Sequence, residues 1–558
     1  MRPSPLILAL AAAVALPSTG RAAETASLAE VSRYADQLLH RTYADKGPGA
    51  AVLVTRGDEV LYRGAIGMDD IAAKDALSAD DRFRIGSITK QFSAAAVLKL
   101  IEDGKIALED PLSKYVKDFP NGDKITVHQL LDHTSGVKSY TGIPGVMEGP
   151  IQKDVTTEQL IDSFKQEKPD FAPGDGWLYN NSGYVLVGAV IEAASGQPWY
   201  AYLDETFFQP LGMKHTGCGC DAKVASQQVD GYTFDGDKAV APKMLSMTQP
   251  HAAGALVSTV DDLQRWNRAL HEGKVLKPES YRLMTTPAGK ALDAKYGFGL
   301  FADSVRGRPS LGHGGGIFGF STMLSYVPGA DVSVVVLQNA DGGRDGKDGP
   351  EELARRLTAV ALGDPYPAPT PIAVEAEALK QLEGIYRLDA NTARTLRVVD
   401  GKLTSLRTGG SVSALIPIGK DEFLYEDGFN RFRVERDLQG KATGMRFFAM
   451  GEGAGEIAAR SGDPLPAQRK GIVLDSSAQE RLIGDYHGMG ETFRVFLEGG
   501  VLKAKLGGQP ALQIHAESAS KFFLTEVDAA LEFAPAEGPA QTLTLRQGGQ
   551  TIEFKRKP

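Results

Sequence analysis

Apolar residues run almost without interruption from Phe92 to Ile101, and alanines dominate the middle of the run. A helix that is apolar nearly all round is buried in the core of a large domain. Ser87 and Lys90 precede the run, and Gly104, a residue type that commonly ends helices, follows it. The pattern therefore predicts a buried helix with Ser87 and Lys90 three residues apart in its first turn.

Shorter patterns on either side of this helix predict a sheet with helices packed against it. Residues 50–62 form two apolar runs around a polar turn and predict a hairpin, and residues 332–337 are typical of a buried strand. Helices are expected over 28–43 and after Thr126, which is a suitable N-cap. A loop of turn residues and aromatics leads to a further helix, expected to begin near Tyr184.

A tandem repeat occupies the C-terminal third of the chain, beyond a proline-rich stretch that is typical of a stiff linker. The motif Leu382-x-Gly384-x-Tyr386 returns as Leu482-x-Gly484-x-Tyr486, a period of 100 residues. Both copies contain short alternating runs cut by glycine turns. We expect two small antiparallel β-barrel domains, over 378–462 and 476–558.

The N-terminus and the charge bear on where the protein acts. Residues 1–22 combine a positive start, an apolar segment and small residues, a pattern typical of a secretory signal peptide. The apolar segment is shorter than the roughly 20 residues that span a bilayer, and no later run approaches that length. We expect a periplasmic or secreted protein with no membrane span in the mature chain. The formal net charge of -9 argues against a nucleic-acid partner.

Composition also limits the classes of catalytic site. The only cysteines, Cys218 and Cys220, are too few for a disulfide framework or a four-ligand zinc site; they either pair as a local loop or remain two thiols. The nine histidines form neither His-x-His nor His-Glu-x-x-His, so we expect no metal and no other cofactor. An α/β-hydrolase would need a Gly-x-Ser-x-Gly turn, which no serine here provides.

Three Ser-x-x-Lys matches are candidates for a nucleophile, and only one of them opens a buried helix. Ser135 is followed at once by a glycine turn, and Ser518 lies in a region of short strands. Ser87 would sit at the positive end of a helix dipole beside the amine of Lys90, an arrangement that activates a hydroxyl. His133 ends a neighbouring helix, and we interpret it as structural.

Two further motifs complete a set. Tyr179-x-Asn181 is the only Tyr-x-Asn triplet of the chain, and His313-Gly314-Gly315 lies in a glycine-dense stretch where backbone must approach something closely. In this order and spacing, Ser87-x-x-Lys90, Tyr179-x-Asn181 and His313-Gly314-Gly315 resemble the motifs of the penicillin-recognising serine hydrolases. That group includes class C β-lactamases, DD-peptidases, D-aminopeptidases and esterases.

The resemblance covers roughly residues 28 to 360 and implies a catalytic domain over 23–362. Its fold would be an α/β (α+β) domain, with an antiparallel sheet flanked by helices and an all-helical part. A catalytic domain followed by two barrels is similar to the layout of bacterial D-aminopeptidases. The third motif is His-Gly-Gly rather than the Lys-Thr-Gly of many β-lactamases, which favours a peptidase or an esterase.

The resemblance also implies roles for single residues. Ser87 would be the nucleophile of an acyl-enzyme mechanism, and Lys90 with Tyr179 would act as one proton-accepting couple. Asn181 would hold the substrate's amide, and His313 would hold a substrate carboxylate or relay a proton. The backbone N–H groups of Ser87 and Gly316 would form the oxyanion hole, and Gly315 would let the strand lie against the substrate.

The expected substrates are small peptides, amides or esters. A D-aminopeptidase or DD-peptidase activity is the first hypothesis, and a carboxylesterase or β-lactamase of the same family is the alternative. A non-catalytic binder of cell-wall peptides or penicillin is the second alternative. The patterns do not decide the acyl donor, the oligomeric state, or whether the barrels cap the cleft or tether the enzyme.

Overall fold

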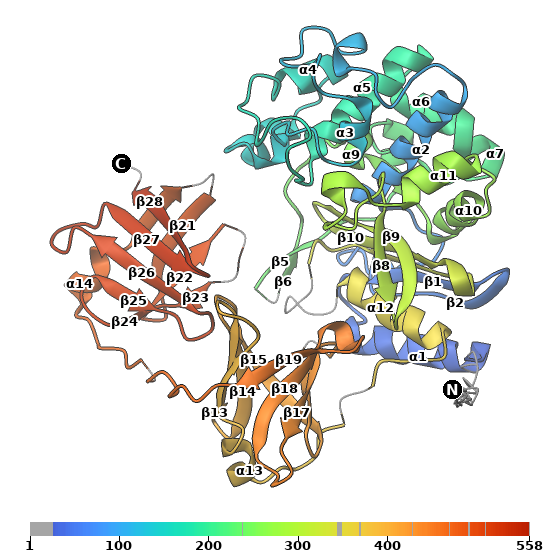
Figure 1. Ribbon diagram of the computed structural model, residues 1–558. Helices are drawn as coiled ribbons and strands as arrows, with labels where there is room; N and C mark the ends of the chain where they lie inside the picture. Colours follow the sequence, from blue (N-terminus) through green and yellow to red (C-terminus); the bar gives the residue numbers. More distant parts are fainter. Residues whose placement is uncertain are drawn as a thin grey trace, which may run out of the picture.

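The computed structural model describes residues 26–556 except 237, 343–348, 368–369, 427, 468, 489–490, 508 and 510. The expected signal peptide, 1–22, lies outside the described residues. A six-stranded antiparallel sheet forms the centre of the N-terminal part, in the order β2-β1-β11-β10-β9-β8 (Figure 1). Its strands are β1 Ala50–Arg56, β2 Glu59–Ile66, β8 Phe301–Val305, β9 Arg308–Ile317, β10 Phe320–Val327 and β11 Val332–Gln338.

Strands β1 and β11 are buried along almost their whole length because helices cover both faces of the sheet. Val52, Val54 and Val334 face a core shared with helices α1 (Leu28–Thr42) and α12 (Pro350–Ala361). Leu53 and Val335 face a second and larger core on the other side. The hairpin, the helix and the buried strand expected over 50–62, 28–43 and 332–337 are confirmed.

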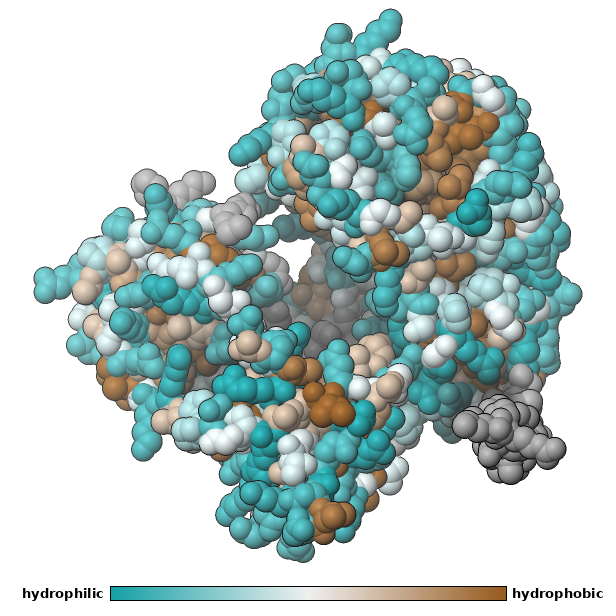
Figure 2. Space-filling view, in the orientation of Figure 1, coloured by the Kyte–Doolittle hydropathy of each residue, from teal (hydrophilic) through white to brown (hydrophobic). Residues whose placement is uncertain are grey.

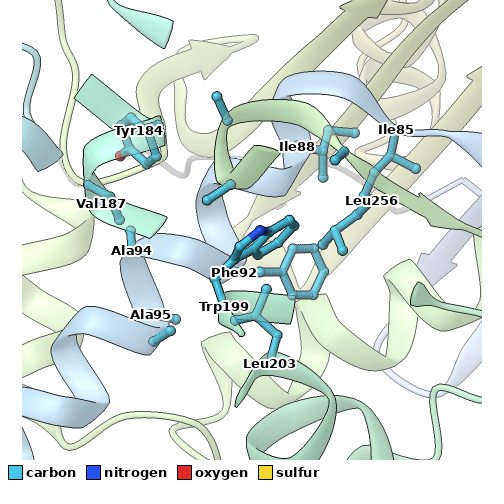
Figure 3. Close-up of a cluster of buried hydrophobic side chains, with 14 of the residues drawn as sticks. Ile85, Ile88, Phe92, Ala94, Ala95, Tyr184, Val187, Trp199, Leu203 and Leu256 are labelled. Atoms are coloured by element: carbon cyan, nitrogen blue, oxygen red, sulfur yellow. The ribbon is translucent and has the colours of Figure 1, made fainter. Parts of the chain in front are cut away.

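The larger core belongs to the helical part of the domain. Its main helices are α2 Thr89–Glu102, α3 Val127–Leu131, α4 Thr157–Asp162, α5 Asn181–Ser195, α6 Trp199–Leu203, α9 His251–Gly254, α10 Val260–His271 and α11 Pro278–Thr285. Helix α2 passes through the middle of this core, and its Phe92 ring stacks on Trp266 with 4.1 Å between ring centroids. Figure 3 shows Ile85, Ile88 and Tyr184 in the same cluster. The buried helix predicted from the apolar run is confirmed.

Two β-barrels follow the helical and sheet layers. The first is closed: β12 Gly384–Arg387, β13 Ala393–Val399, β14 Lys402–Arg407, β15 Val412–Gly419, β16 Glu422–Tyr425, β17 Arg431–Arg436, β18 Ala442–Phe448 and β19 Glu456–Arg460. The second is a nine-stranded, nearly closed sheet: β20 Gly484–Gly488, β21 Glu491–Glu498, β22 Val501–Leu506, β23 Leu512–Gln513, β24 His515–Ala516, β25 Lys521–Phe523, β26 Ala529–Ala534, β27 Thr542–Gln547 and β28 Gln550–Arg556. The expected fold class is therefore confirmed.

The 100-residue repeat is structural as well as sequential. In the first barrel the Tyr386 hydroxyl donates a 2.7 Å hydrogen bond to the Leu382 carbonyl. In the second, the Tyr486 hydroxyl donates a 2.8 Å bond to the Leu482 carbonyl. Each barrel opens with a short helix at the same offset, α13 (Ala376–Lys380) and α14 (Ser476–Glu480). In each barrel the repeated motif therefore forms a hydrogen bond that joins the first strand to the chain just after this helix.

The two barrels contact each other through residues of two loops or strand ends. Ser411 of the first barrel bridges to Val527 of the second, and the Val412 N–H donates to the Glu526 carbonyl at 2.8 Å. The face seen in Figure 2 is largely hydrophilic and is hollowed between the barrels and the part formed by residues 26–362. Among the described residues, no hydrogen bond or ion pair joins the second barrel to residues 26–362.

Three details differ from, or extend, the predictions. The helix expected near Tyr184 begins earlier, at Asn181, because the Asn180 side chain accepts from the Gly183 N–H and caps it. Cys218 and Cys220 form a disulfide. The proline-rich stretch is not a free spacer, since Tyr366 is only 4% exposed and packs into the core beside α12. In the part of the chain that the structure describes, no helix has the length and apolarity needed to cross a membrane.

Candidate active site

Ser87 lies in a single 3₁₀ turn, Gly86–Ile88, that leads directly into α2. Lys90, the second residue of α2, follows Ser87 by three positions, a spacing that places two side chains on the same face. The Nζ atom of Lys90 is accordingly 3.0 Å from Ser87 Oγ. Gly86 has a φ of +51°, which favours glycine, and an added Cβ would lie 3.0 Å from the Gly316 nitrogen. The turn therefore brings the nucleophile candidate against strand β9.

Lys90 is fully buried, and its amine has three polar neighbours. Besides Ser87, Nζ lies 2.9 Å from Asn181 Oδ1 and 2.9 Å from the Ala253 carbonyl oxygen. Burial lowers the pKa of Lys90 well below its usual range because no carboxylate compensates the charge.

These three contacts fit a neutral amine. The Asn181 Oδ1 and Ala253 carbonyl atoms can only accept hydrogen bonds, so they take the two N–H groups. The nitrogen lone pair is then left for the Ser87 hydroxyl, which can donate. The orientation of the Asn181 amide agrees, since its Nδ2 atom donates to Thr141 Oγ1 at 3.2 Å. The geometry thus presents a base to the Ser87 proton.

Tyr179 lies at the end of the loop before α5 and closes the other side of Lys90. The centre of its ring is 4.7 Å from Lys90 Nζ. Its hydroxyl is buried and has no hydrogen-bond partner among the described residues. Burial raises the pKa of Tyr179, an effect that the neighbouring Ser87 hydroxyl partly offsets. The structure therefore holds Tyr179 as a neutral phenol beside a neutral amine.

Two glycines of β9, Gly315 and Gly316, differ in the space available for a side chain. A Cβ on Gly315 would lie 2.0 Å from the Ile85 carbonyl oxygen and 2.3 Å from Thr322 Oγ1, so no side chain fits. A Cβ on Gly316 would meet nothing within 4 Å. The close approach expected from the glycine-dense stretch is real at Gly315, and its partner is the Ile85 backbone.

His313 points into the same region but keeps both ring nitrogens occupied. Nδ1 is 2.6 Å from the Gly314 carbonyl oxygen, which can only accept, so Nδ1 carries the proton. Nε2 then accepts from the Tyr296 hydroxyl at 3.2 Å. Burial lowers the pKa of His313 to about 3. The imidazole is therefore neutral, which suits a relay better than the binding of a carboxylate.

Two cavities meet at Ser87. One, of about 530 Å³, extends past Tyr179 and His313 toward Asp303 and Arg355. The other, of about 470 Å³, is mainly apolar and runs along Gly316 and Ile317. All seven predicted site residues, Ser87, Lys90, Tyr179, Asn181, His313, Gly315 and Gly316, come together around this junction. Their catalytic roles stay predictions.

The other Ser-x-x-Lys matches are built differently. Ser135 is buried, and Lys138 points away to Asp170 at 2.8 Å. Ser518 accepts from the Lys521 backbone N–H at 3.0 Å and so closes a turn. Neither serine is paired with an amine in the described contacts.

Sequence patterns missed several groups around the site. The Ala253 carbonyl and the Tyr296 hydroxyl carry no motif, since they are brought in by α9 and by a loop far along the chain. Gly86 could have been found, because a glycine directly before a helix-opening serine indicates an unusual backbone angle. His133, expected to be structural, packs its buried ring on Tyr179 with centroids 4.4 Å apart.

The sequence model of the Beta-lactamase family matches residues 32–358, more than half of the chain. The chain belongs to the Beta-lactamase family. The members of this family are serine hydrolases. The matched segment contains the whole sheet, the helical part and every residue of the site described above.

Relatives in the Beta-lactamase family carry names of two kinds. A penicillin-binding protein of Bacillus subtilis (strain 168) is 25% identical over 414 residues, 70% of this chain and 90% of the relative. A D-aminopeptidase of Brucella canis is 27% identical over 327 residues, 58% of this chain and 61% of the relative. The octameric penicillin-binding protein homologue from Pyrococcus abyssi superposes with a TM-score of 0.54 at 23% identity, covering 78% of this chain and all of that one, which supports the fold alone.

Proposed function

We propose that the protein is an exported serine hydrolase that acts through an acyl-enzyme on Ser87. Its substrates are small amides or peptides that contain D-amino acids, as the name of the D-aminopeptidase relative suggests. Export follows from the pattern of residues 1–22.

The observation that carries the proposal is the environment of Lys90. A buried amine with two pure acceptors and one hydroxyl around it can keep all three contacts when neutral, and burial lowers its pKa and so favours that state. In that state it can take the Ser87 proton as Oγ attacks a carbonyl carbon. A serine that merely capped a helix would need no such base.

The remaining groups complete an acyl transfer. The N–H groups of Ser87 and Gly316 would stabilise the oxyanion, and the loss of one such donor typically costs about 10²–10³ in rate. Because Tyr179 keeps its proton, it can pass it to the departing amine while Lys90 returns its own to restore the phenol. Water then attacks the Ser87 ester by the same route in reverse.

A fluorophosphonate label tests the nucleophile. Intact-mass spectrometry should show one adduct on the wild-type protein and none on Ser87→Ala. Ser135→Ala is the matched control, since it removes another buried serine of a Ser-x-x-Lys match, and it should label normally. An adduct that persists in Ser87→Ala would refute the assignment.

The acyl donor is decided by a small panel: a D-amino acid amide, a D-Ala-D-Ala peptide, a p-nitrophenyl ester and a chromogenic cephalosporin. We expect the highest kcat/KM on the first two. Preferential turnover of the ester or the cephalosporin would instead support an esterase or a β-lactamase.

A further inference from the structure

A carboxylate of the first barrel reaches into the catalytic part. Glu452 lies between β18 and β19, and its side chain is 12% exposed. Oε1 accepts from the Arg306 N–H at 2.6 Å and from the Tyr366 hydroxyl at 2.8 Å. Oε2 accepts from the Gly307 N–H at 3.0 Å and lies 3.5 Å from Ser304 Oγ. All of these donors lie outside the barrel.

The two backbone donors form the turn of the β8–β9 hairpin. Val305 pairs with Arg308, which leaves a two-residue turn at Arg306 and Gly307. Both have positive φ, 52° and 72°, as a type I′ turn requires. Asparagine and glycine favour that geometry, and arginine does not. The positive φ of Arg306 is therefore unfavourable for its residue type, and the hydrogen bond from its N–H to Glu452 stabilises it.

This hairpin leads into the active site. β9 runs from the turn to His313 and Gly316, and β8 is the last strand of the sheet, with β9 on one side and a short backbone pairing to Lys295 and Tyr296 at its start. Phe301, the first residue of β8, has its ring 5.2 Å from that of His313. Asp303 and Val305 of β8 line the same 530 Å³ cavity that reaches Ser87. A shift of β8 would therefore change one wall of that cavity.

A second contact holds the same edge from the catalytic side. Arg355 of α12 donates to the Ser304 carbonyl at 2.7 Å and is paired with Asp303. It also lies 4.0 Å from Glu452. The edge strand is consequently held between α12 and the barrel, with Glu452 as the barrel's contribution.

We propose that Glu452 is a positioning residue for the active site: it clamps the β8–β9 turn and so sets the wall of the cavity on the His313 side. The first barrel is then part of the specificity apparatus, although it touches no reacting atom. Substrates that extend past His313 depend on this clamp, and substrates confined to the neighbourhood of Ser87 do not. The inference rests on the proposed acyl transfer at Ser87.

Glu452→Gln tests the clamp in the full-length protein, because an amide offers one acceptor where the carboxylate offers two. Glu435→Gln is the matched control, since Glu435 pairs with Arg446 at 2.8 Å within the same barrel. We expect Glu452→Gln to keep kcat/KM for p-nitrophenyl acetate within about twofold. For a four-residue D-alanyl peptide we expect a fall of about tenfold, mainly through KM, and no change in Glu435→Gln.

Hydrogen exchange gives a readout independent of turnover. Amides of the β8–β9 turn should exchange at least about tenfold faster in Glu452→Gln than in the wild type. Arg306→Asn creates the Asn-Gly pair that favours the turn. Glu452→Gln should therefore lower kcat/KM for the peptide by a smaller factor in the Arg306→Asn background than in the wild-type background. Should Glu452→Gln not fold, Glu452→Asp, whose shorter side chain cannot span both amides, takes its place.

Equal losses for the ester and the peptide, or turn exchange at the wild-type rate, would overturn the clamp. A wild-type protein that fails to react with fluorophosphonate refutes the proposed function instead. In that case hydrogen exchange of residues 301–317 in Glu452→Gln is the remaining test of the positioning role. Protection lost from the turn through to His313 supports that role, and loss confined to the turn refutes it.

Discussion

Gly315→Ala is the sharpest perturbation of the site that keeps its chemistry intact. The new Cβ would start 2.0 Å from the Ile85 carbonyl oxygen, whereas ordinary contact begins at 3.4 Å. Strand β9 or the Ser87 turn must therefore move by about 1.4 Å. Thr322 cannot relieve the clash freely, because its hydroxyl donates to that same carbonyl at 3.0 Å. Misplacement of about 1 Å can cost roughly 10²-fold in rate, and overpacking about 1–3 kcal/mol in stability.

We therefore expect fluorophosphonate labelling and kcat/KM to fall at least about 10²-fold in Gly315→Ala, with a free energy of unfolding lower by about 1–3 kcal/mol. Gly316→Ala is the matched control, since its Cβ meets nothing within 4 Å and its N–H is retained. It should unfold within about 0.5 kcal/mol of the wild type. A Gly315→Ala protein with wild-type labelling rate would refute the close approach of β9 to the Ser87 turn.

Three further outcomes follow from the buried titratable groups. Tyr179→Phe combined with Lys90→Ala should be about as slow as the worse single variant, and additive losses in log kcat/KM would mean separate roles. His313→Gln should leave the acidic limb of the pH–rate profile in place, because the His313 pKa is already about 3; a moved limb would assign that limb to His313. Acid should destabilise the fold: burial lowers the pKa of His251, His271 and His313 to about 3, below the usual 6.5, so the unfolded chain binds more protons. Each of these histidines then lowers the free energy of unfolding by up to about 1.4 kcal/mol per pH unit as pH falls from 6.5 toward 3. The loss is measurable as a falling Tm.

Local patterns were sufficient for the elements and for the residues nearest the chemistry. The apolar run of α2, the Thr126 cap and the repeated Leu382 and Leu482 motifs each depend on short-range periodicity or a single local bond. They could be predicted because the physical cause lies within a few residues of the signal.

Groups that reach the site by tertiary packing could not be predicted in the same way. The Ala253 carbonyl accepts a hydrogen bond from the Lys90 amine although it lies 163 positions away in the sequence. A backbone oxygen has no sequence signature. The neutral state of His313 depends on Tyr296 and on burial, neither of which a His-Gly-Gly motif encodes. The clamp at Glu452 is a contact between domains, and one glutamate among many carries no local signal.

The pairing of β1 with β11 has a consequence for synthesis. Val52 lies opposite Val336, so this pair joins strands from the two ends of the domain. At about 5–20 residues per second, a ribosome needs roughly 14–56 s to extend the chain from the end of β1 to the end of β11. Throughout that interval the apolar β1 has only its hairpin partner β2. A nascent chain that ends at Asp331 therefore contains Ser87, Lys90 and His313 and still lacks strand β11, which pairs β1 with β10.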